Sequence, residues 1–135
     1  MIAYVYRDDS DNIHGLAIAL EDENTTMNQT AAATAASGHI SVMGATWRLP
    51  SIDDWKKMFK GCGNGASLNE TRVNYTCFNA KLVSAGGTAI LAGTQYWSSS
   101  ENFTYLSFDG TQVNMSNTDV NEGVSSNHVR ACLAF

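Results

Sequence analysis

The chain has 135 residues, a length that predicts one domain (1–135) with a core burying roughly two thirds of the unfolded chain's surface. Hydrophobic residues make up 44% and charged residues 16%, which excludes intrinsic disorder, because disordered chains combine low hydrophobicity with high net charge. The net charge is −5 and no Lys or Arg lies between Lys81 and Arg130, so we expect no nucleic-acid partner.

The start of the chain is apolar over residues 1–6. This stretch is too short, and lacks the basic residues, to be a signal peptide. No run reaches the roughly 18 apolar residues of a membrane span, so we expect no membrane insertion. Two settings stay open, a cytoplasmic protein or the mature or trimmed end of a longer secreted product.

Two strands and two helices are predicted in the first half. Apolar and β-branched runs at 2–8 and 14–22, separated by a polar turn, predict strands. The Ala-rich stretch 25–38, with Thr residues as N-cap candidates, predicts a short helix. In residues 47–61, Ser51 and Asp54 form a capping-box pattern before a helix that places Ile52, Trp55 and Phe59 on one face.

The second half predicts loops, a hairpin and a last strand. Residues 62–93 indicate loops around a short helical or extended piece at 80–93. Asp109-Gly110 suits a type I′ turn between runs whose alternate residues are apolar, Leu106 and Phe108 against Val113 and Met115. With a strand at 128–135, strands gather at both ends. We therefore expect an α+β fold in which two helices pack on small antiparallel sheets and the N- and C-terminal strands pair.

The candidate catalytic and metal-binding groups are few. Ser98, Ser99 and Ser100 lie outside any Gly-x-Ser-x-Gly elbow, and the His spacing indicates no triad, so we expect no enzyme and no catalytic residues. The three cysteines lack Cys-x-x-Cys spacing, which argues against a zinc site. An oxidising compartment would allow Cys62 to pair with Cys77, while the odd count favours reduced, structural thiols, and Cys132 suits a core position.

Four short segments occur in an order that is known from one protein family. They are "WRLPSIDDW" (47–55), "AGGTA" (85–89), "YWSSSE" (96–101) and "VRACLAF" (129–135). Their order and spacing resemble bacterial C-type lectin-like domains related to the formylglycine-generating enzymes, and the likeness extends from Trp47 to Phe135. The cysteine-based copper site of those enzymes has no counterpart here, because only Cys132 lies near the end of the chain. Animal lectins bind calcium through Glu-Pro-Asn or Trp-Asn-Asp, and neither motif is present. We thus expect no metal and no cofactor.

Within this family, the chain is most similar to the variable proteins of diversity-generating retroelements. In such proteins, adenine-specific errors of reverse transcription rewrite codons between a "YWSSSE" segment and a "VRPVLAF"-like ending. This position corresponds to about 102–128 here, although Ala131 and Cys132 depart from the ending. The resemblance implies a place outside the cell, on its surface or on a phage particle, and a protein or cell-surface receptor of unknown identity as partner.

The genetic code offers a check on this resemblance. Randomising both adenines of an Asn codon yields many residue types but never Lys, Glu, Gln, Met or Trp. No Lys or Trp occurs between Asn102 and His128, and only Gln112, Met115 and Glu122 fall outside the accessible set. Those three are expected to be fixed. The alternative is a surface hairpin that is rich in Asn and Ser without any diversification.

The residues expected to contact the ligand share a mixture of aromatic rings, amides and hydroxyls that is typical of antibody paratopes. They are Asn102, Phe103, Thr104, Tyr105, Asp109, Thr111, Asn114, Ser116, Asn117, Asp119, Asn121, Ser125, Ser126 and Asn127. A non-enzymatic, sequence-diversified ligand-binding domain is the preferred reading. An invariant bacterial adhesin or fimbrial-type surface module of the same fold is the alternative.

Framework residues are expected around this region. Trp47, Trp55 and Trp97 lie in the shared segments and should pack in the core, with each indole N–H bonded to backbone. Arg48 and Arg130 are expected to be buried and paired with Glu101 or Asp54.

Overall fold

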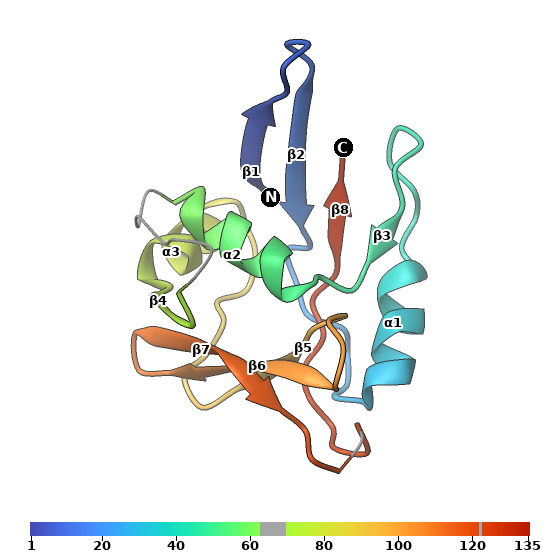
Figure 1. The fold of residues 1–135 in the computed structure, drawn as a ribbon, viewed down its shortest axis with the longest axis vertical. Helices are drawn as coiled ribbons and strands as arrows, with labels where there is room; N and C mark the ends of the chain where they lie inside the picture. Colours follow the sequence, from blue (N-terminus) through green and yellow to red (C-terminus); the bar gives the residue numbers. More distant parts are fainter. Residues whose placement is uncertain (63–69, 122) are drawn as a thin grey trace.

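The computed structural model describes residues 1–62, 70–121 and 123–135. It is a mixed α+β structure with two four-stranded antiparallel sheets (Figure 1). The first sheet has the order β1-β2-β8-β3 and the second β4-β7-β6-β5. In chain order the elements are β1 Ile2–Arg7, β2 Ile13–Ile18, α1 Gln29–Ser37, β3 Trp47–Arg48, α2 Ile52–Lys60, β4 Arg72–Asn74, α3 Thr76–Ser84, β5 Gln95–Trp97, β6 Thr104–Asp109, β7 Gln112–Thr118 and β8 Cys132–Ala134.

The terminal strands lie in the same sheet, but they do not pair directly. β1 and β8 both pair with β2, which lies between them. The strand predicted at 128–135 is shorter than expected, and only Cys132–Ala134 forms it. Val129, Arg130 and Ala131 are buried before the strand begins.

The capping box predicted from the sequence is present at the start of α2. The Ser51 hydroxyl accepts a hydrogen bond from the Asp54 amide at 3.1 Å, and the Asp54 carboxylate accepts one from the Ser51 amide at 2.8 Å. Trp55 and Phe59 are fully buried and Ile52 packs against the same core. In Figure 1, α2 runs across the middle of the molecule between the two sheets.

α1 begins at a different cap from the one predicted. Asn28, and not a Thr, accepts a hydrogen bond from the Ala31 amide at 2.9 Å. The helix buries Ala32 and Ala36, whose small side chains pack with Leu49 and Trp97 in a second hydrophobic cluster. The side-chain oxygen of Asn28 is as good an acceptor as a Thr hydroxyl, and Asn28 lies one residue before the helix.

The sequence prediction of loops around a short helical or extended piece at 80–93 misses β4 and the first half of α3, while residues 80–84 of α3 fall within that piece. α3 starts at Thr76, after Tyr75, which makes no side-chain capping hydrogen bond, so the usual start signal is lacking. Its buried residues are Phe78 and Leu82, four positions apart and on one face. Packing of Phe78 and Leu82 onto the main core therefore stabilises α3, although the local sequence provides no N-terminal cap.

The main core is aromatic and joins both sheets to α2 and α3. The Trp55 ring lies edge-on to Phe78, Tyr96 and Phe108, with centroids 6.2 to 6.3 Å apart. The indole N–H of Trp97 donates to the Met27 carbonyl and that of Trp47 to the Ile40 carbonyl, as predicted. The prediction is wrong for Trp55, whose buried Nε1 has no hydrogen-bond partner among the described residues, because aromatic rings surround it.

Asp54→Asn should destabilise the protein at neutral pH by about 1–2 kcal/mol, because it weakens both the cap and the Arg48 ion pair. Partial burial opposes ionisation of Asp54, but hydrogen bonds from Arg48 and Ser51 outweigh it and lower the pKa of the carboxyl. A lowered pKa stabilises the fold above the unfolded pKa of about 3.9, and this contribution is lost as the pH falls through the folded pKa.

Urea unfolding of both proteins at about pH 7 and about pH 3 measures this effect. The gap in unfolding free energy between wild type and Asp54→Asn should shrink on acidification. An equal gap at both pH values would contradict a stabilising charge at Asp54. Asp53→Asn is the matched control, since Asp53 is an exposed neighbour in the same helical turn.

Candidate functional site

The second sheet has one buried and one polar face. Along β6 and β7, the residues Leu106, Phe108, Val113 and Met115 are at most 2% exposed, which confirms the alternation predicted from the sequence. The residues between them lie on the opposite face, because successive side chains of a strand point to opposite sides. We call this opposite side the outer face of the second sheet.

Polar residues form rows across the outer face. Arg72 pairs with Asn114, Asn114 with Ser107, and Ser107 with Gln95, so one row crosses all four strands. A second row carries Asn74, Gln112 and Asp109. All of these side chains are exposed or half-buried. The outer face therefore offers amide, hydroxyl, carboxylate and guanidinium groups side by side.

The hairpin turn differs from the predicted one. Asp109 pairs with Gln112, so the two loop residues are Gly110 and Thr111 instead of Asp109 and Gly110. Gly110 has φ +56°, whereas Thr111 has no positive φ, and a type I′ turn requires positive φ at both central residues. A Gly with positive φ at the first central position is typical of type II′. A bulge between Tyr105 and Ser107 also shifts the register.

The fourteen predicted ligand contacts divide by exposure. Six are exposed, namely Asn102, Asp109, Thr111, Ser116, Asn121 and Ser126. Six are half-buried, namely Phe103, Thr104, Tyr105, Asn114, Asn117 and Ser125. Asp119 and Asn127 are buried, with 9% and 4% exposed, so a partner would reach little of them.

Asp119 and Asn127 hold the loop that follows β7. The Asp119 carboxylate accepts a hydrogen bond from the Asn121 amide at 2.8 Å, and within the described ranges its other oxygen, Oδ2, has no partner of normal geometry. The Asn121 amide, and then Ser125 and the Gly123 amide, lower the pKa of Asp119, although burial opposes them. The backbones of Asn127 and Met27 exchange two hydrogen bonds of 3.1 Å. These residues fix the loop to the rest of the molecule.

Phe103 and Tyr105 link the predicted surface to the second hydrophobic cluster. Both pack against it, and the Tyr105 ring lies edge-on to Trp97 at 6.2 Å. A Cβ on Gly123 would come within 2.4 Å of the Phe103 ring, so this glycine allows the ring to lie over the loop. Each of these two aromatic side chains is thus partly buried against the cluster and partly exposed on the predicted contact surface.

A small hollow lies beside the outer face. Its volume is about 190 Å³. It is lined by Gln95, Tyr105, Thr118, Asp119, Val120, Asn121, Ser125 and Asn127. Five of these are predicted contact residues, so the fold brings residues from β6 and from the loop after β7 to one place.

The serines of "YWSSSE" hold the backbone, as predicted. The Ser100 hydroxyl accepts a hydrogen bond from the Ile52 amide at 3.0 Å, and the buried Ser98 hydroxyl accepts one from the Ser100 amide at 2.9 Å. The carbonyl of Ser98 accepts a hydrogen bond from Gln29 at 2.6 Å. This segment ties α1 and α2 to the start of the predicted variable region.

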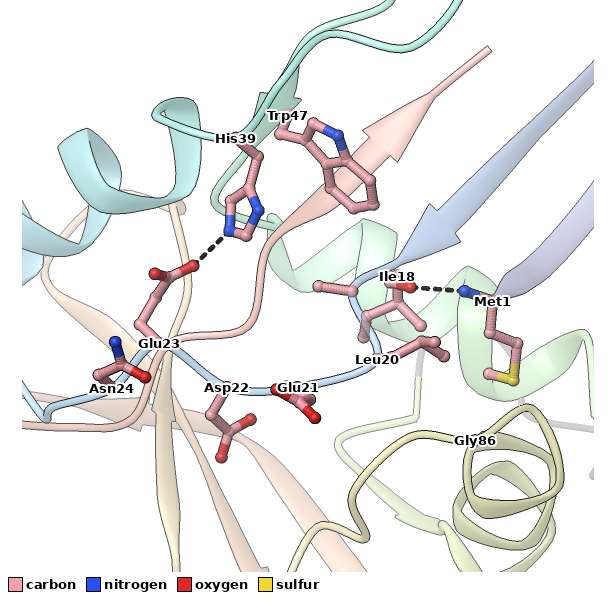
Figure 2. A pocket seen from close by; sticks show the side chains of 11 residues that line it. Met1, Ile18, Leu20, Glu21, Asp22, Glu23, Asn24, His39, Trp47 and Gly86 are labelled. Atoms are coloured by element: carbon pink, nitrogen blue, oxygen red, sulfur yellow. Dashed lines mark hydrogen bonds and ion pairs between the residues drawn. The ribbon is translucent and has the colours of Figure 1, made fainter.

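A second hollow, of about 660 Å³, is lined by the end of β2, the chain 19–24 that follows it, His39 and Trp47, and it was not predicted (Figure 2). Figure 2 shows the His39 ring directed at the Glu23 carboxylate, 2.5 Å away, and next to the Trp47 ring. The acidic run 21–23 was the only sequence signal for it. Among the described residues, no group of three or more His, Cys, Asp or Glu side chains could hold a metal ion.

Arg48 and Arg130 both form ion pairs. Arg48 donates to both oxygens of Asp54, at 2.5 and 3.1 Å, as predicted, but its side chain is 42% exposed and not buried as expected. Arg130 is buried but pairs with Asp22, at 2.5 Å, and not with Glu101 or Asp54. The predicted partners of Arg130 are wrong because its actual partner, Asp22, follows β2 and lies far from Arg130 in sequence, so that only the folded chain brings the two together.

Within the described ranges, none of the helices is long and apolar enough to cross a membrane. Comparisons of the chain with protein-family models, with curated proteins and with solved structures find no match.

Proposed function

We propose that this protein is a non-enzymatic ligand-binding domain that displays a hypervariable surface generated by a diversity-generating retroelement. The observation that carries the proposal is the alternation along β6 and β7. Leu106, Phe108, Val113 and Met115 are buried in an aromatic core, and the residues between them form a polar outer face. A surface of this kind can change its side chains without changing its core.

The C-type lectin-like fold is part of the same proposal. The two small antiparallel sheets, with the last strand paired inside the first sheet, are compatible with it. So are the roles of the shared segments, since "WRLPSIDDW" forms β3 and the capped start of α2, and "YWSSSE" anchors the entry to the hairpin.

The chemistry of the outer face suits recognition of a protein. Tyr105 supplies aromatic area at a low cost in side-chain entropy, and the Asn and Ser residues supply adaptable hydrogen bonds. The partner that we propose is a protein or cell-surface receptor. The contact set is the twelve exposed and half-buried residues of the predicted list, without the buried Asp119 and Asn127.

Deep sequencing of the 3′ end of the gene in its native population tests this function. Substitutions should cluster at adenine-derived codons for outer-face and loop residues such as Asn114 and Asn117. They should spare the buried Phe108, Val113 and Arg130. Met115 is buried and Gln112 is exposed, and both should be fixed, while the fixed position expected at Glu122 lies outside the described residues.

A near-copy repeat and a reverse-transcriptase gene should lie beside the locus. If the region is invariant and no repeat is found, the diversification proposal fails. The invariant adhesin or fimbrial-type module would then be the better reading, and one natural ligand should be sought.

A further inference from the structure

Two of the three cysteines come together at the junction of α2 and α3. Cys62 follows Gly61, the C-cap of α2, and Cys77 is the second residue of α3. The Cys77 thiol donates a hydrogen bond to the Cys62 carbonyl at 3.1 Å. The sulfur of one cysteine therefore lies against the backbone of the other.

The two thiols also contact each other and are open to reagents. Both residues are half-exposed free thiols, whereas Cys132 is fully buried. Partial burial, and then the hydrogen bond with the Cys77 thiol, raise the pKa of Cys62 to about 11. The Lys81 ammonium, which donates to the Gly61 carbonyl at 3.3 Å, acts in the opposite direction.

We propose that Cys62 and Cys77 are a dithiol site that closes to a disulfide when the protein meets a small-molecule disulfide such as oxidised glutathione. One cysteine, as the thiolate, attacks the glutathione disulfide, forms a mixed disulfide and releases one glutathione thiol. The second cysteine then attacks the mixed disulfide and releases the second glutathione. The protein loses two protons and two electrons, and the oxidant is reduced to two thiols.

The bond would join the end of α2 to the first turn of α3. Disulfides require Cα atoms within about 7 Å, and the 3.1 Å contact between Cys77 Sγ and the Cys62 carbonyl places the two backbones side by side, close to this range. The ring closed by the bond runs from Cys62 to Cys77, so the unfolded chain would lose conformational freedom. Residue 62 packs on the main core, which the bond would hold together.

Tryptic mapping of the folded protein after incubation with oxidised glutathione tests the site. Trypsin cleaves after Lys60, Arg72 and Lys81, so the bond would join peptide 61–72 to peptide 73–81. We expect this joined pair, an intact mass lower by two hydrogens, and a melting temperature higher by about 10 °C. Cys132→Ala should give the same joined pair, and Cys62→Ser should give none.

Three outcomes would overturn the proposal. They are glutathione adducts that persist on both cysteines, joined peptides that form only in urea, and a bond that forms but lowers the melting temperature. Each reports on the dithiol geometry alone. The inference does not rest on the proposed function, so it can fail or hold whether or not the outer face is diversified.

Discussion

Arg130→Met is expected to lower the free energy of unfolding by about 3 kcal/mol, because it removes one partner of a buried, hydrogen-bonded ion pair. Arg130 is 1% exposed. Its guanidinium donates to Asp22 at 2.5 Å, to the Thr88 carbonyl at 2.9 Å and to the Thr88 hydroxyl at 3.0 Å. The Met side chain fills similar space but leaves the Thr88 carbonyl without its donor.

Asp22 connects this pair to the second sheet. Its other oxygen accepts a hydrogen bond from the Tyr96 hydroxyl at 2.5 Å. Burial, followed by the hydrogen bond to Asp22, raises the pKa of Tyr96 above its ordinary value, so the hydroxyl stays a donor. The Asp22 side chain is 24% exposed. If Arg130 is lost, water can hydrate the Asp22 carboxylate only partly, and the guanidinium that balanced its charge is gone.

Urea unfolding of four proteins measures the size of the interaction. They are the wild type, Arg130→Met, Asp22→Asn and the double variant, which together form a double-mutant cycle. The double variant should lose less than the sum of the single losses. Arg72→Met, at an exposed arginine, should stay within about 0.5 kcal/mol of wild type. An unchanged unfolding midpoint for Arg130→Met would show that the pair adds nothing to the fold.

Phe108→Ala should cost about 4 kcal/mol, whereas Ser107→Ala on the same strand should change stability by less than about 0.5 kcal/mol. Phe108 is 1% exposed and lies edge-on to Tyr75 at 4.9 Å and to Tyr96 at 5.3 Å. Truncation would leave a cavity between α2 and the second sheet. Ser107 points to the outer face, where water can replace its side chain.

The comparison of Phe108 with Ser107 tests whether the core residues of this strand stabilise the fold while the outer-face residues can be replaced. Both variants are made in one strand, so the backbone context is the same, and urea unfolding gives both free energies. Similar losses at Phe108 and Ser107 would mean that the outer face cannot accept replacement. The proposed function would then lose its physical basis, even if the fold stayed as described.

The features that could be predicted from the sequence depend on residues close together in the chain. The capping box of α2 requires only Ser51 and Asp54, and the alternation of β6 and β7 is visible within a few residues. The start of α3 was missed because Tyr75 provides no cap, and the burial of Phe78 that stabilises the helix comes from distant elements.

The candidate site shows the same limit. The alternation correctly separated core from outer face along the hairpin. The burial of Asn127 depends on Met27, which is distant in sequence, and the partner of Arg130 is Asp22, a long way back along the chain. No spacing rule connects these residues, because their contacts arise only when the two sheets are assembled.

The fixed register of the hairpin limits the kind of variation that this protein could accept. On either side of the turn, the buried Leu106, Phe108, Val113 and Met115 alternate with outer-face residues, and the loop after β7 is bonded to Met27 and to β5 at its far end. Inserting or deleting one residue in a strand would turn every following side chain over, placing Asn in the core and Phe or Val in water. Exchange of side chains at constant length avoids this. Such a surface can therefore vary in the chemistry of its side chains but not in the length of its chain, unlike loops that evolve by insertion and deletion.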